Sequence, residues 1–163
     1  MTERRPLPRE DHFAKYFSHK YLIHDPPESD NVVGVPPQAI QPRPIDHGEL
    51  SGNHLEWFTA ATLTEKVFAL SKHLADNKLL TVRRSGRFGV AAVAEIKVMA
   101  ESAGIVVGVV EDPIEGPPAD PSHALILGLP VEIHLVHEEI AKMITPYSAL
   151  PVGASPPVDP SRS

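Results

Sequence analysis

The chain has 163 residues, is 42% hydrophobic and carries a formal net charge of -6 at pH 7. Nucleic-acid binding needs clustered Lys and Arg to neutralise phosphates, so the acidic balance argues against that class of function. The absence of cysteine excludes disulfides and thiolate-based metal or redox sites.

The amino-terminal residues, MTERRPLPRED, lack the apolar stretch of a secretory signal. No window of the sequence approaches the roughly 20 apolar residues that a membrane-spanning helix requires. We therefore expect a cytoplasmic protein that makes no contact with a membrane. The chain length fits one domain with a core of its own.

The 18 prolines leave the middle of the chain free, since none lies between Leu50 and Asp112. Proline blocks helix interiors and removes a backbone donor, so this distribution outlines the folded centre. Proline-rich, polar ends have too little apolar surface to bury. The predicted organisation is a disordered amino terminus (1–10), one domain (11–145) made of an irregular arm (11–53) and a core (54–145), and a disordered proline-rich tail (146–163).

The first element, DHFAKYFSHKYLI (11–23), has aromatic spacing that predicts a short helix leading into a strand. A second helix begins near Thr62, which has capping-box spacing to Glu65, and apolar residues recur at helical intervals up to Asn77. The segment LLTVRR (79–84) then predicts a short strand.

The following segment, GVAAVAEIKVMAESAG (89–104), predicts a helix that ends at Gly104. Two strands, 105–112 and 123–130, are apolar on both faces, as in the interior of a sheet. A last helix over 131–144 has Pro130 at its first turn.

This order of elements predicts an α+β fold. A helix joins strands 79–84 and 105–112, which favours a parallel βαβ crossover, and the short connection to 123–130 favours an antiparallel return. We expect a small mixed β-sheet packed by about three helices, with proline-rich irregular arms.

His123 stands between a proline-rich loop and a wholly apolar strand. In a functional interpretation it is a general base oriented by Asp112 or Asp120, in a cleft that His47 or Asp46 also approaches. In a structural interpretation its ring bonds a loop carbonyl and closes the strand. We expect the structural role, because a catalytic histidine needs an orienting partner that the sequence does not locate.

The segment TVRRSGRFGVAA places arginines around two glycines ahead of a predicted helix. Backbone amides at a helix amino terminus attract anions, and arginines reinforce that attraction. The spacing matches neither the dinucleotide nor the P-loop fingerprint, so no cofactor is predicted. Solvated arginines in a tight turn are the simpler interpretation. The candidate anion-binding residues are Arg83, Arg84, Gly86, Arg87 and Gly89.

The segment HLVHEE sets His134 and His137 at a spacing that could hold a metal on a helix. The HExxH pattern of zinc proteases is absent, and the second histidine flanks an apolar stripe. We therefore predict a half-buried structural role for His137 and no metal site.

Trp57 and Phe58 come just before the helix that begins near Thr62. Aromatic residues in that position usually attach a helix to the core, and exposed ones would contact another protein.

Three segments occur in a fixed order: SDNVVGVPPQAIQPRPIDHGELS (29–51), FGVAAVAEIKVMAESAGIVVGVVEDP (88–113) and PSHALILGLP (121–130). Together they resemble a group of small bacterial proteins of unassigned biochemistry, which share a turn-rich arm, a V-x-x-DP strand and an H-A-L-I segment. The chain departs from that pattern at Ile40, where the group often has Phe, and at Gly52, where it often has Val. The resemblance implies a bacterial origin, a compact α+β unit and an accessory role, and it carries over no catalytic residue.

The leading hypothesis from the sequence is a non-enzymatic binding or accessory protein that works through a protein partner. It rests on incomplete catalytic constellations and on proline-rich segments such as GVPPQAIQPRP, which suit aromatic grooves. One alternative is a small hydrolase or acid–base enzyme with His123 in a cleft. Another is an anion- or nucleotide-binding module that uses Arg83 to Gly89 for a small anionic ligand.

Overall fold

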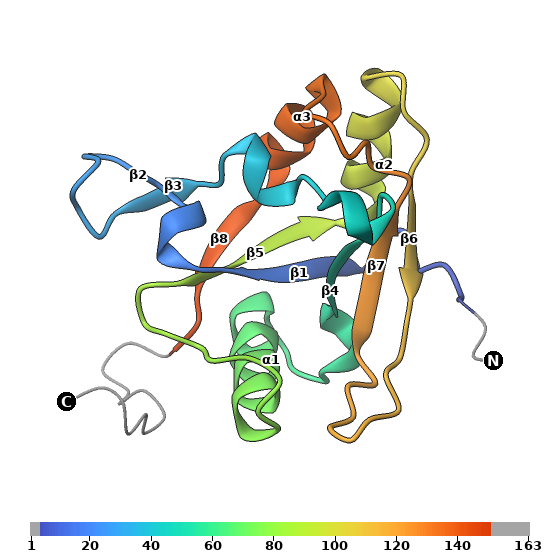
Figure 1. Ribbon diagram of the computed structural model, residues 1–163. Coiled ribbons are helices and arrows are strands. Elements are labelled where there is room, and N and C mark those ends of the chain that lie inside the picture. Colours follow the sequence, from blue (N-terminus) through green and yellow to red (C-terminus); the bar gives the residue numbers. More distant parts are fainter. Residues whose placement is uncertain (1–3, 151–163) are drawn as a thin grey trace.

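A six-stranded antiparallel sheet forms the centre of the computed structural model, which describes residues 4–150 (Figure 1). The strand order is β6-β7-β4-β1-β5-β8, and every neighbouring pair runs antiparallel. A separate pair, β2 and β3, forms a hairpin that projects from one side of the domain. The strands are β1 (His12–Phe17), β2 (Ile23–His24), β3 (Val32–Gly34), β4 (Leu50–His54), β5 (Arg87–Ala92), β6 (Gly108–Glu111), β7 (His123–Leu127) and β8 (Thr145–Ser148).

Helices cover both faces of this sheet, with α1 on one face and α2 beside α3 on the other (Figure 1). Each face buries an apolar cluster: Leu70 and Phe88 belong to the cluster under α1, and Phe13 and Ile96 to the cluster under α2 and α3. The predicted α+β class is confirmed. The helices are α1 (Leu63–Asp76), α2 (Val93–Ser102) and α3 (Leu135–Met143), with 3-10 turns η1 (His19–Tyr21), η2 (Pro37–Ile40), η3 (Pro44–Asp46) and η4 (Leu55–Trp57).

The start and end predicted for α1 are both confirmed. The Thr62 hydroxyl accepts a hydrogen bond from the Glu65 backbone N–H at 3.1 Å, and Asn77 caps the other end. Strands β6 and β7 are also confirmed as antiparallel neighbours. The interior position predicted for both strands holds for β7, which also pairs with β4, and is wrong for β6, which is the first strand of the sheet. Residues 105–107 lie outside β6, and Val106 is 85% exposed.

The crossover helix is α2, but the strand that precedes it differs from the prediction. Residues 79–84 form no strand; the backbone N–H groups of Leu79 and Leu80 bond to the Leu74 carbonyl at 2.9 and 3.3 Å, extending the turn that ends α1. Strand β5 comes next in the chain instead. It runs in the same direction as β6 but is separated from it by three strands, so the predicted parallel pairing is wrong.

The predicted helix at 89–104 is correspondingly shorter, because its first residues belong to β5. The run Val90-Ala91-Ala92-Val93 suits a buried strand as well as a helix, so periodicity alone could not assign it. Packing decides in favour of the strand. Gly89 lies so close to Phe17 and Ile144 that any side chain there would collide with them.

The segment expected to be an irregular arm (11–53) contributes two inner strands, β1 and β4. The helix predicted at 11–23 is wrong, because its aromatic residues alternate across a sheet. Phe13 and Phe17 join one apolar cluster, while Ala14 and Tyr16 contact the other. Phe13 and Phe17 are four residues apart, a spacing common to a helix face and a strand face.

Both predicted disordered ends also contain ordered structure. Leu7 is 4% exposed, and its N–H bonds to the Val109 carbonyl at 2.9 Å along the outer edge of β6. At the other end, β8 pairs with β5 within the predicted tail. The remaining parts of those predictions, residues 1–3 and 151–163, lie outside the described residues. Between residues 4 and 150, no helix has the length and apolar character to cross a membrane.

Candidate functional site

The sheet opens into a groove between β1 and β4. The two strands pair only at Phe13 with His54 and at Ala14 with Asn53, and then diverge. Beyond that point the Lys15 ammonium bridges the gap, donating to the Ser51 carbonyl at 3.0 Å. Close packing holds the closed end, because a side chain at Gly52 would collide with the Phe13 ring and the Ala14 carbonyl.

Two cavities, of about 790 and 300 Å³, together make up this β1–β4 groove. The larger reaches Asp46 and Glu49 at one end, and the smaller reaches Asp120 and His123 at the other. Volumes of this size suit a small molecule. Both cavities are lined by Lys15, Tyr16, Ser51, Leu79 and Leu80, which makes them one continuous groove.

His123 is the strongest candidate for proton transfer in the groove. Its ring Nδ1 lies 3.0 Å from the Asp112 carboxylate and 3.1 Å from the Asp112 backbone carbonyl. Because both neighbours only accept hydrogen bonds, Nδ1 carries the proton of the neutral ring. Nε2 is then unprotonated and has no hydrogen-bond partner within residues 4–150. An orienting carboxylate and a bare Nε2 are what a general base requires.

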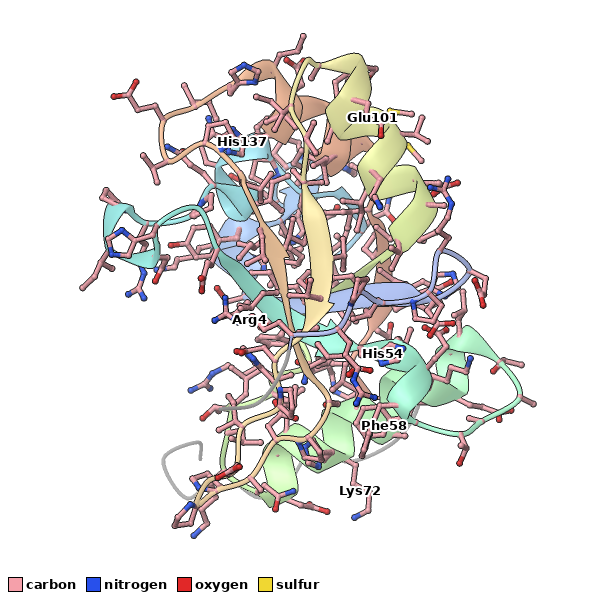
Figure 2. The ribbon with its side chains drawn as sticks, turned by 90° about the vertical axis from the view of Figure 1, so that its right-hand side faces the viewer. Arg4, His54, Phe58, Lys72, Glu101 and His137 are labelled. Carbon is pink, nitrogen blue, oxygen red and sulfur yellow. The ribbon has the colours of Figure 1, made fainter. Side chains whose placement is uncertain are left out.

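Arg4 fixes the carboxylate that orients His123. Its guanidinium lies 3.4 Å from Asp112 and 3.1 Å from Glu49, and Figure 2 shows it beside β6 and β7. Arg4 therefore helps to hold in place the Asp112 carboxylate that accepts the His123 Nδ1–H. The sequence prediction missed Arg4 because it assigned residues 1–10 to a disordered end.

Asp120, predicted beside His123, serves a different purpose. The residue is 2% exposed, and its carboxylate accepts hydrogen bonds from Asn53 at 3.0 Å, Ser122 at 2.8 Å and His73 at 3.1 Å. Its carboxylate makes no hydrogen bond to the His123 ring. Buried carboxylates are tolerated when hydrogen bonds compensate for lost water, so this network anchors the loop before β7 to α1.

Lys15 is the second ionisable group that the groove presents. Burial lowers the pKa of its amine; the nearby Asp46 carboxylate acts in the opposite direction, and the Arg43 guanidinium lowers the pKa further. Asp46 is itself engaged by Arg43 at 2.9 and 3.0 Å, and this hydrogen bonding lowers the Asp46 pKa. Burial therefore disfavours the charged form of the Lys15 amine.

The cleft predicted from the sequence is thus only partly assembled. His123 and Asp112 come together, and Asp46 lines the distant end of the groove. His47 is exposed and lines neither groove cavity. Lys15 and Tyr16 were missed because they fall in the segment predicted as a helix.

The predicted anion site at Arg83 to Gly89 is not at a helix amino terminus, because β5 separates it from α2. Gly86 and Gly89 have packing roles, since a side chain would collide with Tyr16 at the first and with Phe17 at the second. The Arg83 N–H donates to the Tyr16 hydroxyl at 2.9 Å. Arg84 and Arg87 line a separate cavity.

His134 and His137 cap the amino terminus of α3. The Val136 N–H donates to Nδ1 of His134, and the His134 N–H donates to Nδ1 of His137, both at 3.0 Å. Nε2 of His137 donates to the Pro130 carbonyl at 2.9 Å. Because α3 begins at Leu135, Pro130 lies outside the helix and is not at its first turn as predicted. Burial lowers the His137 pKa, although the hydrogen bonds to Pro130 and His134 oppose that effect.

Trp57 and Phe58, the aromatic pair before α1, have different surroundings. Phe58 packs with the α1 cluster, and its ring centre lies 5.6 Å from that of His73. Trp57 is 54% exposed and so does not attach the helix to the core.

A further group of ionisable residues, not anticipated from the sequence, surrounds the start of β1. Asp11, His54 and Glu56 place potential metal-ligating atoms within 4.8 Å of one another. The Glu56 carboxylate also accepts hydrogen bonds from the His12 ring at 2.8 Å and from the Lys66 ammonium at 3.2 Å. Burial raises the Glu56 pKa, but those hydrogen bonds outweigh it and the net direction is downward. The Lys66 ammonium already supplies a positive charge beside the Glu56 carboxylate.

No family model, curated protein or solved structure matches the chain. The resemblance to a group of small bacterial proteins therefore stays a prediction.

Proposed function

We propose that this protein is a small acid–base enzyme that acts on a polar small molecule bound in the β1–β4 groove. The observation that carries the proposal is the Asp112–His123 pair at 3.0 Å, in which Nδ1 is held and Nε2 is bare. His123 lines the same cavity as Lys15, so a base and an amine face one substrate-sized volume.

The chemistry assigns one role to each group. His123 Nε2 removes a proton from the substrate or from a water molecule, and Asp112 stabilises the resulting imidazolium. The Lys15 amine lies where it can return a proton or hold a negatively charged substrate oxygen. Arg4 acts as a positioning residue through Asp112 and needs no contact with substrate.

Turnover of 4-nitrophenyl acetate, a small activated ester, tests the proposal without knowledge of the natural substrate. His123→Gln removes the base, and we expect the rate to fall at least about a hundredfold, the low end of what general-base catalysis contributes. Asp112→Asn keeps the shape of the side chain but weakens its hold on the His123 ring, so the turnover rate of this variant falls by less.

His47→Asn is the matched control, since His47 is exposed, lies outside the groove and has a φ of 52° that asparagine tolerates. Thermal melts show whether each variant folds. A His123→Gln protein that folds and retains the His47→Asn rate would contradict the proposal.

A second candidate function is protein-partner binding, and the exposed Trp57 favours it. Exposed tryptophans are common energetic centres of interfaces. Co-purification of a stoichiometric partner that is lost with Trp57→Ser, while Ile45→Ser retains it, supports this function. Ile45 is 74% exposed and provides an apolar control elsewhere on the surface.

A further inference from the structure

A separate cavity of about 400 Å³ lies where the β2–β3 hairpin meets the start of β5 and the end of β8. We call it the Arg87 pocket. It shares no lining residue with the two cavities of the β1–β4 groove. Among its described lining residues, Asp30 carries the single carboxylate. The hydrogen-bond donors in its lining are His19, His24, Arg84, Ser85, Arg87 and Ser148.

The Arg87 guanidinium is held in place by backbone carbonyls. Nη1 donates to the carbonyls of Arg84 and Gly86 at 2.9 and 2.8 Å, and Nη2 contacts the carbonyl of Asp30 at 3.4 Å. Within residues 4–150 no carboxylate forms an ion pair with it. Arg43, by contrast, makes a two-pronged contact with Asp46. A fixed cation without an acidic partner favours an added anion.

Two histidines add donors to the same cavity. The ring centres of His19 and His24 lie 4.4 Å apart, and neither ring hydrogen-bonds to any residue between 4 and 150. An imidazole ring donates a hydrogen bond through its N–H. The rings come from η1 and β2, while Arg87 comes from β5, so the donors approach from different elements.

We propose that the Arg87 pocket binds the phosphoryl group of a small phosphorylated molecule, held by Arg87, His19 and His24. Several donors arranged around one volume suit a tetrahedral group with multiple acceptor oxygens. The cavity is larger than phosphate alone and leaves room beside Val32 for the rest of the ligand. The net charge of -6 disfavours a long polyanion, which favours a small ligand over a nucleic acid.

Isothermal calorimetry with inorganic phosphate and with adenosine 5′-monophosphate tests this site. We expect at least one probe to bind, and both Arg87→Gln and His19→Ala to weaken the binding about tenfold, as loss of a charge-assisted hydrogen bond does. His19 is exposed, so His19→Ala keeps the test decisive if Arg87→Gln fails to fold.

Arg43→Gln is the control, because it removes an arginine that lines the groove and not this pocket. Binding of phosphate alone, or of the nucleotide alone, supports the site, and in the second case the room beside Val32 is also used. No binding of either probe would overturn it. Equal weakening by Arg43→Gln would also overturn it, because the attraction would then be diffuse. His123→Gln leaves phosphate binding unchanged, so this outcome is independent of the proposed enzyme activity.

Discussion

The Asp112 carboxylate and the His123 ring meet at 3.0 Å across the ends of two neighbouring strands, β6 and β7. Asp112 follows the last residue of β6, and His123 is the first residue of β7. The Asp112 N–H also donates to the His123 carbonyl at 2.8 Å, so the backbone ladder fixes the distance between the two side chains. The orientation of the ring therefore depends on the pairing of β6 with β7, and a base held by its supporting contacts is what catalysis requires.

Lys15→Met is expected to retain the fold and lose activity in the groove. Methionine keeps the apolar stem and removes a charge that burial disfavours, so the thermal midpoint should stay at or above that of the wild type. Turnover of 4-nitrophenyl acetate falls if the amine takes part in the reaction. Lys72→Met, at an exposed position on α1, controls for loss of a lysine. A Lys15→Met protein with wild-type turnover would remove Lys15 from the mechanism.

Asn53→Ala is expected to destabilise the domain by about 1–3 kcal/mol, because it leaves buried acceptors on Asp120 and Ser122 without a donor. Chemical denaturation measures the change in free energy of unfolding. Gln38→Ala, at an exposed position, serves as the control and should change little. Equal stabilities for these two variants would show that the Asp120 network does not anchor the loop.

Gly52→Ala is expected to cost about 1–3 kcal/mol, because the added methyl group collides with the Phe13 ring and the Ala14 carbonyl. Gly34→Ala is a close match, since Gly34 is also in a strand but an alanine Cβ there would have no neighbouring atom within 4 Å. Thermal melts of the two variants compare them directly. A neutral Gly52→Ala would mean that β1 and β4 are free to move apart at the closed end of the groove.

Stability should fall with acid partly through His137. Its folded-state pKa lies below the ordinary value of 6.5, because the ring is buried. Just below pH 6.5 the unfolded chain therefore binds more protons than the folded one, and the free energy of unfolding decreases as pH decreases. His137→Gln loses capping contacts and is less stable at neutral pH, but its stability depends less on pH.

Denaturation series across this pH window measure the effect, with His47→Asn expected to retain the wild-type slope. If His137→Gln shows the same slope as the wild type, the acid sensitivity originates at other groups.

Local signals predicted the parts of this fold that depend on local contacts. The Thr62 cap and the apolar repeat of α1 involve residues within a few positions of each other, and β6 and β7 are joined by one loop. HFAKYF was misassigned because its apolar spacing fits a helix and a strand equally. Its position inside the sheet depends on pairing with β5, whose residues are 70 to 80 positions away in the sequence.

The same difference between local and long-range contacts applies to the candidate site. His123 and Asp112 could be named together because they flank adjacent strands. The groove itself could not be foreseen, since it arises where the β1–β4 pairing stops after Ala14. Nothing near Lys15 in the sequence indicates that its amine bridges to Ser51.

The tautomer of His123 tests the central claim most directly. Long-range proton–nitrogen NMR correlation at a pH where the ring is neutral identifies which nitrogen carries the hydrogen. The contacts with Asp112 predict a protonated Nδ1 and a bare Nε2, a pattern that Asp112→Asn should weaken. A ring protonated at Nε2 would contradict the assignment of His123 as the base.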